Sequence, residues 1–419
     1  MTKLVVMGQG YVGLPMALRA AATGIAVTGF DSNDAVAVAL ASGRSHIGDV
    51  SDEDLARGLA TGYTATSDPR CLAEADVIIV CVPTPLGEGG GPDLTAVKLA
   101  AELIGALVTP GTLCILESTT YPGTTEEIFA PRVATDRLTV GETVFVAFSP
   151  ERINPGQSTY LVRNTPKVVG GLTPECTRRA AEFYGRFVDT VVSAKGAREA
   201  EMAKLLENTF RHVNIALVNE MIRFSHELDI DLWNAIDCAE TKPFGFMAFR
   251  PGPGVGGHCI PVDPSYLSHR VKAVLGYSFR MVELAEEVNT AAPQYVVERV
   301  ILELNKRRQS VNGAKILLLG ITYKPDVADL RETPATPIAT RLLTLGADVW
   351  FHDPHVSTWD VAGRALEPVA DPYASAAAAD LVVLLQPHAT YDLNALADTG
   401  AHVFDSCGAM RPGGRIVRL

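Results

Sequence analysis

The chain has 419 residues, of which 36 are Lys or Arg and 48 are Asp or Glu, so its formal net charge is −12. Hydrophobic residues make up 47% of it and charged residues 20%, which excludes a disordered chain and favours two or three globular domains. The basic residues form no run longer than the three at 306–308. We therefore expect no nucleic-acid partner, and an anionic ligand would need a few locally placed cations.

Cysteine usage and the N-terminal residues indicate the compartment. The 7 cysteines include no CxxC pair, which argues against a disulfide framework and a structural zinc site, and we predict no metal. The first residues lack the charged and apolar regions of a signal peptide. No apolar stretch reaches the roughly 18 residues that a membrane span needs. We expect a cytoplasmic protein without a membrane partner.

The N-terminal residues predict a strand, a glycine-rich turn, an Ala-rich helix and a second strand that ends on Asp31. Apolar runs of strand length that do not alternate with polar residues lie at 3–7, 25–30, 75–83 and 111–116. Such runs are typical of strands that a parallel sheet buries on both faces.

The hydrophobic period changes between Ala197 and Asp229. Apolar residues there recur at steps of three and four, with no Pro or Gly between them: Met202, Leu206, Phe210, Val213, Leu217, Met221, Phe224 and Leu228. This pattern predicts one long amphipathic helix. A second helical stretch is predicted for 277–306, after a segment rich in Gly and Pro.

The opening pattern returns near the C-terminus, with strands predicted at 314–319, 347–351 and 379–387 and a helix at 337–345. This second copy lacks the glycine-rich turn, so we expect it to bind something other than a dinucleotide. The predicted fold class is α/β, with two Rossmann-like, doubly wound parallel-sheet domains joined by a long central helix and a helical middle domain. The predicted domains are 1–195, 196–308 and 309–419.

The turn after the first strand has the pattern GxGxxG, formed by Gly8, Gly10 and Gly13, and Asp31 lies at the end of the next strand. Glycines permit the tight turn and let backbone N–H groups approach a pyrophosphate at the helix N-terminus. A carboxylate at the position of Asp31 binds the adenosine ribose and would repel a 2′-phosphate. The turn alone could be purely structural, but with both strands and the acid it predicts a dinucleotide site that prefers NAD to NADP.

Cys259 lies in a loop dense in glycine, between Gly257 and Pro261. The other cysteines suit small buried hydrophobes, and this reading also remains open for Cys259. Beside a nicotinamide-binding fold, an exposed thiol has a specific use. It can trap an aldehyde as a thiohemiacetal, which a second hydride transfer oxidises to a thioester. For the neighbouring His258 we favour a structural role.

Lys204, Asn208 and Arg211 form one stripe on the long helix, opposite the apolar stripe. Such a stripe is ordinarily a solvated face. A cation with an amide one turn away could instead stabilise an oxyanion and position water. The spacing does not choose between these two readings.

Polar residues follow several predicted strands, in the segments 83–85, 117–120 and 149–156. In doubly wound sheets the ligand lies at the carboxyl ends of the strands, so these segments are placed to meet it, although each could be ordinary loop structure. The segment 320–334 holds the corresponding place in the C-terminal domain. There Lys324 and Arg331 could supply the local cations that a phosphorylated substrate needs.

Seven motifs in order along the chain resemble the UDP-glucose/GDP-mannose dehydrogenase family of nucleotide-sugar 6-dehydrogenases. They are GxGYVGLP at 8–15, VPTP at 82–85, ESTTYPGT at 117–124, SPERINPG at 149–156, the Lys-x-x-x-Asn pair at 204–208, GVGGHCIPVDP at 254–264 and YKPDVADLRETP at 323–334. The resemblance runs essentially from end to end. It implies oxidation of C6 of a sugar nucleotide from alcohol to carboxylate, with two NAD consumed per turnover.

The resemblance also implies catalytic roles for single residues. Cys259 matches the covalent nucleophile, and Lys204 and Asn208 match the pair that stabilises the oxyanion. Asp263 matches the carboxylate that holds the catalytic water. Glu151 matches the glutamate that assists thioester hydrolysis.

Binding residues follow from the same motifs, and Thr119 matches a threonine near the reacting carbon. The implied NAD contacts are Gly8, Gly10, Tyr11, Val12, Gly13, Asp31, Thr84, Thr119 and Arg331. The implied substrate contacts are Arg152, Ile153, Lys204, Asn208, Arg211, Gly256, Tyr323 and Lys324. The long central helix is the family's dimerisation element, so we expect a homodimer or a larger homo-oligomer.

Two departures from the family pattern bear on the sugar. UDP-glucose members usually read SPEFLxEG where this chain has 152–155 as RINP, and GGxCxxKD where it has 258–263 as HCIPVD. Both resemble the branch that acts on UDP-N-acetylhexosamines, and ESTTYPGT resembles its N-acetylglucosamine 6-dehydrogenases. Arg250 stands where we expect an aromatic residue in that group. It would add a cation beside the substrate loop, and we include it among the expected substrate-binding residues.

We therefore expect an NAD-dependent, four-electron oxidation of a UDP-N-acetylhexosamine, with UDP-N-acetylglucosamine favoured. The expected route passes through a thiohemiacetal and a thioester on Cys259. A UDP-glucose 6-dehydrogenase is the alternative within the same class of enzyme. A nucleotide-sugar-binding protein without turnover is a further alternative, disfavoured because every catalytic position is filled.

Overall fold

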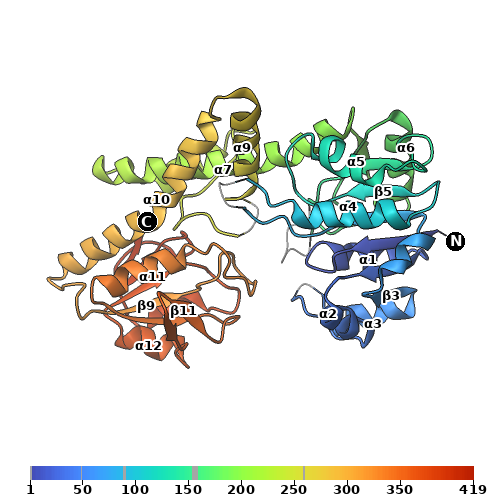
Figure 1. The fold of residues 1–419 in the computed structure, drawn as a ribbon. Coiled ribbons are helices and arrows are strands. Elements are labelled where there is room, and N and C mark those ends of the chain that lie inside the picture. Colours follow the sequence, from blue (N-terminus) through green and yellow to red (C-terminus); the bar gives the residue numbers. More distant parts are fainter. Residues whose placement is uncertain (1, 49, 88–90, 153–158, 258–259) are drawn as a thin grey trace. The chain divides into compact units, whose positions relative to one another are not determined.

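A computed structural model describes residues 2–48, 50–87, 91–152, 159–257 and 260–419. The chain divides into two compact units, of which the first comprises 1–207 with 265–276 and the second comprises 208–264 with 277–419 (Figure 1). The residues predicted for a helical middle domain, 196–308, are distributed over both units.

The first unit is built on an eight-stranded sheet in the order β3-β2-β1-β4-β5-β6-β7-β8. Neighbouring strands pair in parallel, apart from β6 and β7, which pair antiparallel. The strands are β1 (Lys3–Met7), β2 (Ala26–Phe30), β3 (Tyr63–Thr66), β4 (Val77–Val80), β5 (Leu113–Leu116), β6 (Phe145–Phe148), β7 (Lys167–Gly171) and β8 (Val191–Ser193).

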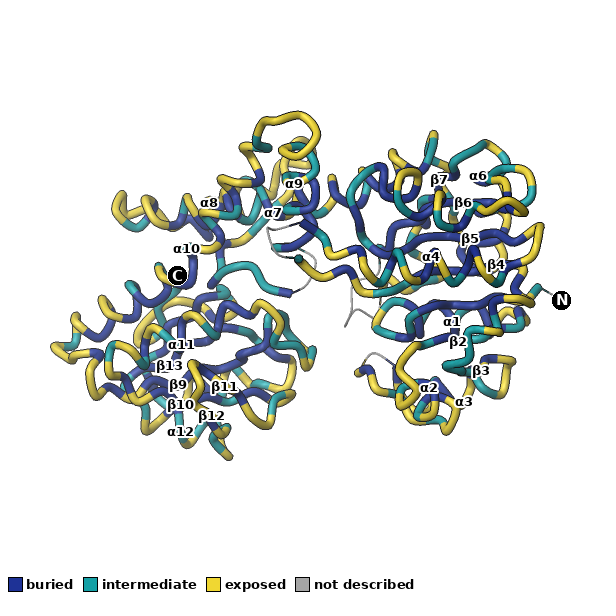
Figure 2. Tube along the Cα trace, viewed as in Figure 1, coloured by how far each residue is buried: buried dark blue, intermediate teal, exposed yellow. Residues whose placement is uncertain are grey.

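Helices cover both faces of this sheet, which explains why its central strands are apolar throughout. Leu4 and Val6 of β1 belong to the core shared with α1 and α6, whereas Val5 and Met7 belong to the core shared with α4. Figure 2 shows β4 and β5 buried along their length. The helices are α1 (Gly13–Ala21), α2 (Asp34–Ala41), α3 (Asp52–Ala60), α4 (Thr95–Leu107), α5 (Ala130–Val133) and α6 (Pro174–Tyr184), with shorter turns η1 (Pro69–Glu74) and η2 (Thr125–Phe129).

The predicted long helix is confirmed as α7 (Ala197–Glu227), which runs on from the first unit into the second. Its apolar stripe faces outward in this single chain, and the exposed members are Met202, Leu206, Phe210, Leu217 and Phe224. The opposite side is buried, including Lys204 and His212. The helices that follow are α8 (Leu232–Glu240), α9 (Asp263–Leu275) and α10 (Arg280–Lys306).

The second unit contains a five-stranded parallel sheet in the order β10-β9-β13-β14-β15. Its strands are β9 (Lys315–Leu319), β10 (Asp348–His352), β13 (Leu381–Leu384), β14 (Val403–Asp405) and β15 (Ile416–Arg418), and a hairpin joins β11 (Trp359–Val361) to β12 (Arg364–Leu366). The helices within this sheet's connections are α11 (Ala335–Thr344), α12 (Pro372–Ala378) and α13 (Leu393–Asp398).

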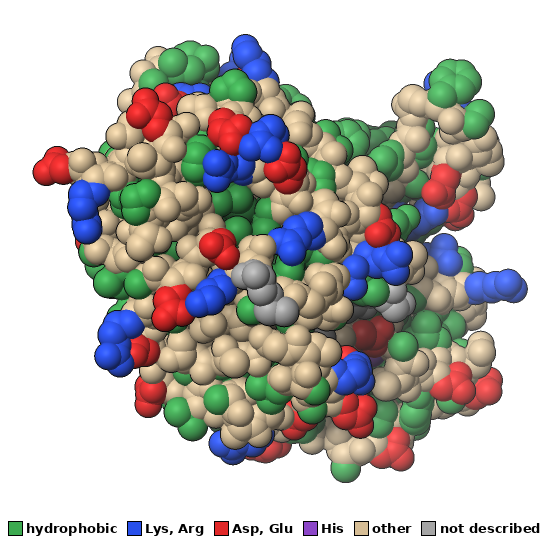
Figure 3. Space-filling model, turned by 90° about the vertical axis from the view of Figure 1, so that its right-hand side faces the viewer, with side chains coloured by type: hydrophobic (Ala, Val, Ile, Leu, Met, Phe, Trp, Pro, Cys, Tyr) green, Lys and Arg blue, Asp and Glu red, His purple; other side chains and the backbone are tan. Residues whose placement is uncertain are grey.

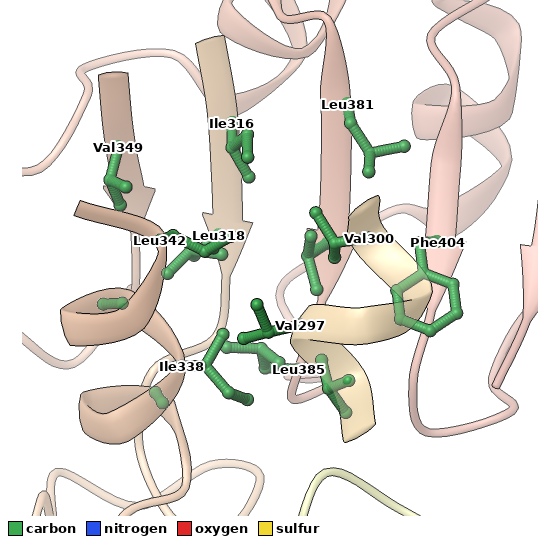
Figure 4. Packing of buried hydrophobic residues seen from close by; sticks show 14 of the residues in the cluster. Val297, Val300, Ile316, Leu318, Ile338, Leu342, Val349, Leu381, Leu385 and Phe404 are labelled. Carbon is green, nitrogen blue, oxygen red and sulfur yellow. The ribbon is translucent and has the colours of Figure 1, made fainter. Parts of the chain in front are cut away.

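One core of this sheet is formed with α10 and α11 (Figure 4). Val297 and Val300 of α10 and Ile338 of α11 pack with Ile316 and Leu318 of β9, and all five are fully buried. Burying such a side chain contributes roughly 1.5–3 kcal/mol. The other face packs with α12 and α13, so this sheet too is doubly wound.

The predicted α/β class and its two parallel-sheet domains are confirmed, and the predicted strands and helices lie where the sequence indicated. The described residues include no helix long and apolar enough to cross a membrane. On the face shown in Figure 3, basic side chains stand beside acidic ones. Exposed ion pairs on the surface of the first unit include Arg178 with Glu175 and Arg198 with Glu126.

Candidate functional site

The glycine-rich turn between β1 and α1 requires two of its three glycines for steric reasons. Gly8 has φ +88°, and an added Cβ there would lie 2.6 Å from the backbone oxygen of Cys81. At Gly13 a Cβ would lie 1.9 Å from the oxygen of Gly8. At Gly10 no atom lies within 4 Å of the corresponding position, so this side of the turn is open. The turn thus offers backbone N–H groups and free space at the N-terminus of α1, as a pyrophosphate site needs.

Asp31, at the end of β2, is fixed beside this turn. Its carboxylate accepts hydrogen bonds from the backbone N–H groups of Gln9 and Asn33, each at 2.9 Å. Gln9 is itself buried and accepts a hydrogen bond from the Tyr63 hydroxyl at 2.8 Å. Burial and the nearby Asp31 carboxylate raise the pKa of Tyr63 well above its ordinary value. The acid is therefore oriented before any ligand arrives.

The ends of β4 and β5 are tied together by hydrogen bonds. The Thr84 hydroxyl donates to the backbone oxygen of Thr119 at 2.9 Å, and the Ser118 hydroxyl donates to the oxygen of Val82 at 2.7 Å. The buried Tyr266 of α9 donates its hydroxyl proton to the backbone oxygen of Thr84. Thr84 and Thr119, both predicted to contact the cofactor, are thus held in one local network.

A buried ionic network lies behind the same strand ends. Glu117 follows β5 and is 1% exposed; Lys167, which begins β7, places Nζ 2.9 Å from its Oε2. The Tyr184 hydroxyl of α6 donates to Glu117 Oε1. Lys167 Nζ also lies 4.0 Å from Oε2 of Glu151, which is 8% exposed.

This network holds one ammonium for two carboxylates away from water. Burial raises the pKa of Glu117, although the nearby Lys167 ammonium opposes the shift. Burial alone would lower the pKa of Lys167, but the carboxylates of Glu117 and Glu151 outweigh it and raise that pKa above its ordinary value. Lys167 is therefore a persistent cation close to Glu151, the residue predicted to assist hydrolysis.

The solvated-face reading of the polar stripe is wrong for Lys204. This side chain is only 9% exposed, and its Nζ donates to the backbone oxygen of Glu151 at 2.6 Å. Arg211, on the same stripe, is exposed. A buried ammonium with a fixed position can stabilise negative charge that develops beside it.

Arg152, the residue after Glu151, forms an ion pair with α7 and donates a hydrogen bond to a backbone oxygen. Its guanidinium pairs with Glu207, with Nη2 2.6 Å from Oε1, and Nη1 donates to the oxygen of Pro166 at 2.8 Å. Its predicted partner in substrate binding, Ile153, lies outside the described residues.

Glu201, one turn before Lys204 on α7, anchors the loop that carries Thr119. Its carboxylate is fully buried and accepts hydrogen bonds from the backbone N–H groups of Gly123 at 2.6 Å and Thr125 at 2.8 Å. The Thr125 hydroxyl donates to it as well, at 2.7 Å. Burial raises the pKa of Glu201 to about 7, against the effect of these hydrogen bonds.

In the second unit, Asn208 of α7 and Asp263 of α9 form a pair. The Asn208 amide donates to Oδ2 of Asp263, which is 2% exposed and begins α9. A carboxylate at a helix N-terminus is stabilised by the helix dipole. The predicted oxyanion group and the predicted water-holding group are thus in direct contact.

The loop that leads to Cys259 packs closely on the segment after β9. The Gly257 N–H donates to the backbone oxygen of Arg331 at 3.0 Å. A Cβ at Gly256 would lie 2.7 Å from the oxygen of Glu332, and one at Gly257 would lie 2.6 Å from the Tyr323 ring. Both glycines are required by this approach. His258 and Cys259 lie outside the described residues.

A cavity of about 450 Å³ adjoins this loop, with Val255 and Pro261 in its wall. His212 of α7, 1% exposed, places Nε2 3.4 Å from Oε2 of Glu286, and burial raises the pKa of Glu286. Asn289 donates to the backbone oxygen of His212 at 3.2 Å. The wall of the cavity therefore contains the titratable side chains of His212 and Glu286 among apolar residues such as Val255.

Two predicted cations of this unit, Arg250 and Arg331, pair with carboxylates of the protein. Arg250 pairs with Asp237 at 2.8 Å and Glu240 at 2.9 Å, both on α8. Arg331 pairs with Asp329, with Nη2 2.7 Å from Oδ2. A substrate phosphate would therefore compete with a carboxylate for either guanidinium.

Comparison with known proteins identifies the family. Residues 2–188 match the NAD binding domain of the UDP-glucose/GDP-mannose dehydrogenase family, 198–291 match its central domain and 317–412 match its UDP binding domain. The chain belongs to the UDP-glucose/GDP-mannose dehydrogenase family. It is thus an NAD-dependent nucleotide-sugar dehydrogenase, as the sequence motifs predicted.

Several members of the family are similar over nearly the whole chain. A UDP-N-acetyl-D-glucosamine 6-dehydrogenase of Pseudomonas aeruginosa is 37% identical, over 93% of this chain and 91% of its own. A UDP-N-acetyl-D-mannosamine dehydrogenase of Methanocaldococcus jannaschii is 33% identical, over 93% of this chain and 86% of its own. Among solved structures, the UDP-D-ManNAc dehydrogenase of Pyrococcus horikoshii superposes with a TM-score of 0.87 at 29% identity, over 100% of this chain and 98% of that one.

Sequence reasoning missed the buried supports of this dehydrogenase site, namely Lys167, Tyr184, Glu201, His212 and Tyr266. A lysine that begins an apolar strand and a glutamate on the buried side of α7 are weak signals of pairing. Their partners are far away in sequence, so spacing could not reveal them. The catalytic and binding roles of the predicted residues stay predictions.

We predict that replacing Glu201 by Gln destabilises the protein most at low pH. The folded-state pKa of Glu201, about 7, lies above its unfolded value, so the stabilisation is fully present below the unfolded pKa and is lost as pH rises through about 7. The gap in unfolding free energy between unmodified protein and Glu201→Gln should narrow by about 3 kcal/mol between about pH 5 and pH 8. Calorimetric unfolding at both pH values measures it.

Glu199→Gln is the matched control, because Glu199 is exposed on the same helix. Its effect on the free energy of unfolding should be small at both pH values. If Glu201→Gln lowers the free energy of unfolding equally at both pH values, the carboxylate does not titrate as described.

Proposed function

We propose that this enzyme oxidises C6 of a UDP-N-acetylhexosamine to the carboxylate, with UDP-N-acetylglucosamine as the favoured substrate. The observation that supports the chemistry best is the pair of polar groups on α7. Lys204 is buried with its ammonium fixed by the backbone oxygen of Glu151, and one turn later Asn208 donates to the buried Asp263. An ammonium and an amide so held suit an oxyanion, and a buried carboxylate suits the positioning of water.

In this proposal the glycine-rich turn between β1 and α1, together with Asp31, would hold NAD, which would supply the hydride acceptor for each of two oxidations of the substrate carbon. The first oxidation converts the C6 alcohol to an aldehyde and releases one proton. The Cys259 thiol adds to the aldehyde, and Lys204 and Asn208 stabilise the oxyanion of the thiohemiacetal. The second oxidation yields the thioester, which water held by Asp263 hydrolyses to the carboxylate and the free thiol. One alcohol, two NAD⁺ and one water thus give one carboxylate, two NADH and three protons.

Glu151 is suited to assist the hydrolysis. Its carboxylate is nearly buried and lies 4.0 Å from the persistent cation Lys167. Its backbone oxygen orients Lys204, so a single residue links the proposed water chemistry to the proposed oxyanion site. Arg152, which follows it, is braced by Glu207.

The sugar assignment is supported by two features of the sequence. The segment 152–155 lacks the second acid that UDP-glucose members usually carry, and the segment 258–263 has Val262 where those members usually have Lys. The similarity to a UDP-N-acetyl-D-glucosamine 6-dehydrogenase over 93% of the chain points the same way. The manno epimer is the second candidate, because the Methanocaldococcus and Pyrococcus relatives are named as mannosamine enzymes.

We predict reduction of NAD with UDP-N-acetylglucosamine in a panel that also contains its manno epimer and UDP-glucose. Absorbance of the reduced cofactor measures the rates. Cys259→Ala should lower turnover by about a thousandfold or more, because the variant lacks the thiol that carries the acyl group in this proposal. Cys238→Ala is the matched control, since Cys238 is exposed on α8, and it should keep the unmodified rate.

Rapid turnover of UDP-glucose with none of either N-acetylhexosamine would reverse the sugar assignment. No turnover of any sugar nucleotide would favour a binding protein. Steady oxidation by Cys259→Ala near the unmodified rate would rule out the covalent route.

We further propose that the enzyme is a homodimer or larger, assembled through the exposed apolar stripe of α7. Leu206 is 63% exposed and Leu217 is 53% exposed in the single chain. An apolar stripe of this length on one helix is costly to leave in water, and a second copy of the same helix would cover it.

We expect analytical sedimentation to show at least a dimer at micromolar concentration. Leu217→Glu should shift the protein toward monomer, because it places a charge in the covered stripe. Glu220→Gln, at an exposed neighbouring position, should leave the assembly unchanged. An unmodified protein that sediments as a monomer would remove this proposal.

A further inference from the structure

A buried cluster in the second unit joins two loops that follow adjacent strands. Asp353 follows β10, and His388 lies in the loop after β13; both side chains are fully buried. They contact the segment 321–326 after β9, where the nucleotide-binding motif YKPD lies. None of these contacts was predicted from the sequence.

The hydrogen bonds assign the tautomer of His388. Its Nδ1 lies 2.9 Å from the backbone nitrogen of Asp326, whose N–H can only donate, so Nδ1 is the acceptor. Its Nε2 lies 2.9 Å from Oδ2 of Asp353 and therefore carries the proton that it donates. His388 is thus a neutral imidazole with both ring nitrogens engaged.

Asp353 also fixes the start of the loop 321–326. Asp353 Oδ2 also accepts hydrogen bonds from the backbone N–H groups of Ile321 at 2.7 Å and Thr322 at 3.2 Å. Burial opposes ionisation, but the hydrogen bonds from His388 and from the backbone hold the pKa of Asp353 below its ordinary value. The carboxylate therefore remains an acceptor for the loop.

The loop end needs His388 because Asp326 has an unfavourable backbone conformation. Its φ is +61°, in the left-handed region that few residues other than glycine adopt. Two hydrogen bonds hold it there, the one from its N–H to His388 and one from the Ala389 N–H to its Oδ1, at 2.8 Å. Lys324, a predicted substrate contact, lies between the two anchored ends of this loop.

The cluster could also be read as a metal site, since ligand atoms of Asp326, His355 and His388 lie within 4.8 Å of one another. Both nitrogens of His388 already take part in hydrogen bonds, however, and a metal would have to displace the Asp326 N–H or the Asp353 carboxylate. The hydrogen bonds account for the cluster without an ion.

We infer that His388 is a positioning residue for the nucleotide-binding loop, and that only its neutral form holds the loop in shape for the diphosphate of the substrate. This inference rests on the proposed nucleotide-sugar function. Protonation would turn Nδ1 into a donor that faces the N–H of Asp326. The nearest alternative acceptor for it is Asp326 Oδ1 at 3.8 Å, which already accepts from Ala389, so the loop would have to rearrange.

The charged and titratable groups that face His388 come from three loops. Asp353 and His355 follow β10, Asp326 follows β9, and Tyr391 follows His388 itself; the ring centroid of His355 lies 5.0 Å and that of Tyr391 5.6 Å from the imidazole. A protonated His388 would donate from both ring nitrogens and could no longer accept from the N–H of Asp326.

The test is calorimetric binding of UDP-N-acetylglucosamine without NAD, at pH 8 and pH 5.5. Both phosphates of this ligand are diesters, so the ligand does not titrate in this range. We expect the unmodified protein to bind about tenfold more weakly at pH 5.5, because the competent loop is depopulated. NAD affinity, a property of the first unit, serves as the control for folding at each pH.

Two variants test whether His388 acts as a hydrogen-bond acceptor or only fills space with its side chain. His388→Asn keeps an acceptor near the position of Nδ1 and cannot titrate, so it should bind almost as tightly as the unmodified protein at pH 8 and lose most of the pH dependence. His388→Leu removes the acceptor and should bind about tenfold more weakly at both pH values. If His388→Leu does not fold, the comparison of unmodified protein with His388→Asn decides.

The inference is overturned if unmodified binding is independent of pH, if His388→Asn titrates as the unmodified protein does, or if it binds as weakly as His388→Leu at pH 8. Each of these outcomes leaves the proposed function intact. Absence of binding by the unmodified protein at pH 8 would instead overturn the proposed function together with this inference.

Discussion

Ionised side chains that are buried at the carboxyl ends of parallel strands must be paired or hydrogen-bonded, and within each unit the candidate site residues depend on that constraint. A buried charge without a partner costs several kcal/mol, whereas a paired and hydrogen-bonded one can be tolerated. Glu117 is paired with the Lys167 ammonium in the first unit, and Asp353 accepts hydrogen bonds from the neutral His388 and from two backbone N–H groups in the second. In each case the pair lies directly behind loops that carry predicted ligand contacts.

Buried polar side chains hold the candidate site residues in place mainly through hydrogen bonds to the backbone. Lys204 is oriented by a backbone oxygen, Glu201 accepts from two backbone N–H groups, and Asp353 accepts from two more. A loop fixed in this way presents its side chains without paying ordering entropy when the ligand binds. The same logic explains the glycines of both units, where Gly8 and Gly256 allow one backbone to approach another closely.

The sequence predicted the sheets, the long helix and the dinucleotide turn well, because each depends on local pattern. Continuous apolar runs marked β1 and β4, and the three-four period marked α7 along its length. It could not predict that Lys204 is buried, since solvated and buried stripes share one spacing and only the fold decides which side faces inward. Nor could it show that Glu117 meets Lys167, because those residues are brought together by β5 and β7, which do not even pair with each other.

The most direct measurement is a double-mutant cycle on Glu117 and Lys167, read as the free energy of unfolding. If buried pairing is the governing constraint, Glu117→Gln and Lys167→Met should each be strongly destabilising. The first leaves the Lys167 ammonium with only the more distant Glu151 carboxylate, at 4.0 Å, and the second leaves two buried carboxylates without this ammonium. The double variant should then be more stable than the sum of the single effects predicts, by about 2 kcal/mol or more. Single effects that add to within about 0.5 kcal/mol would contradict the account.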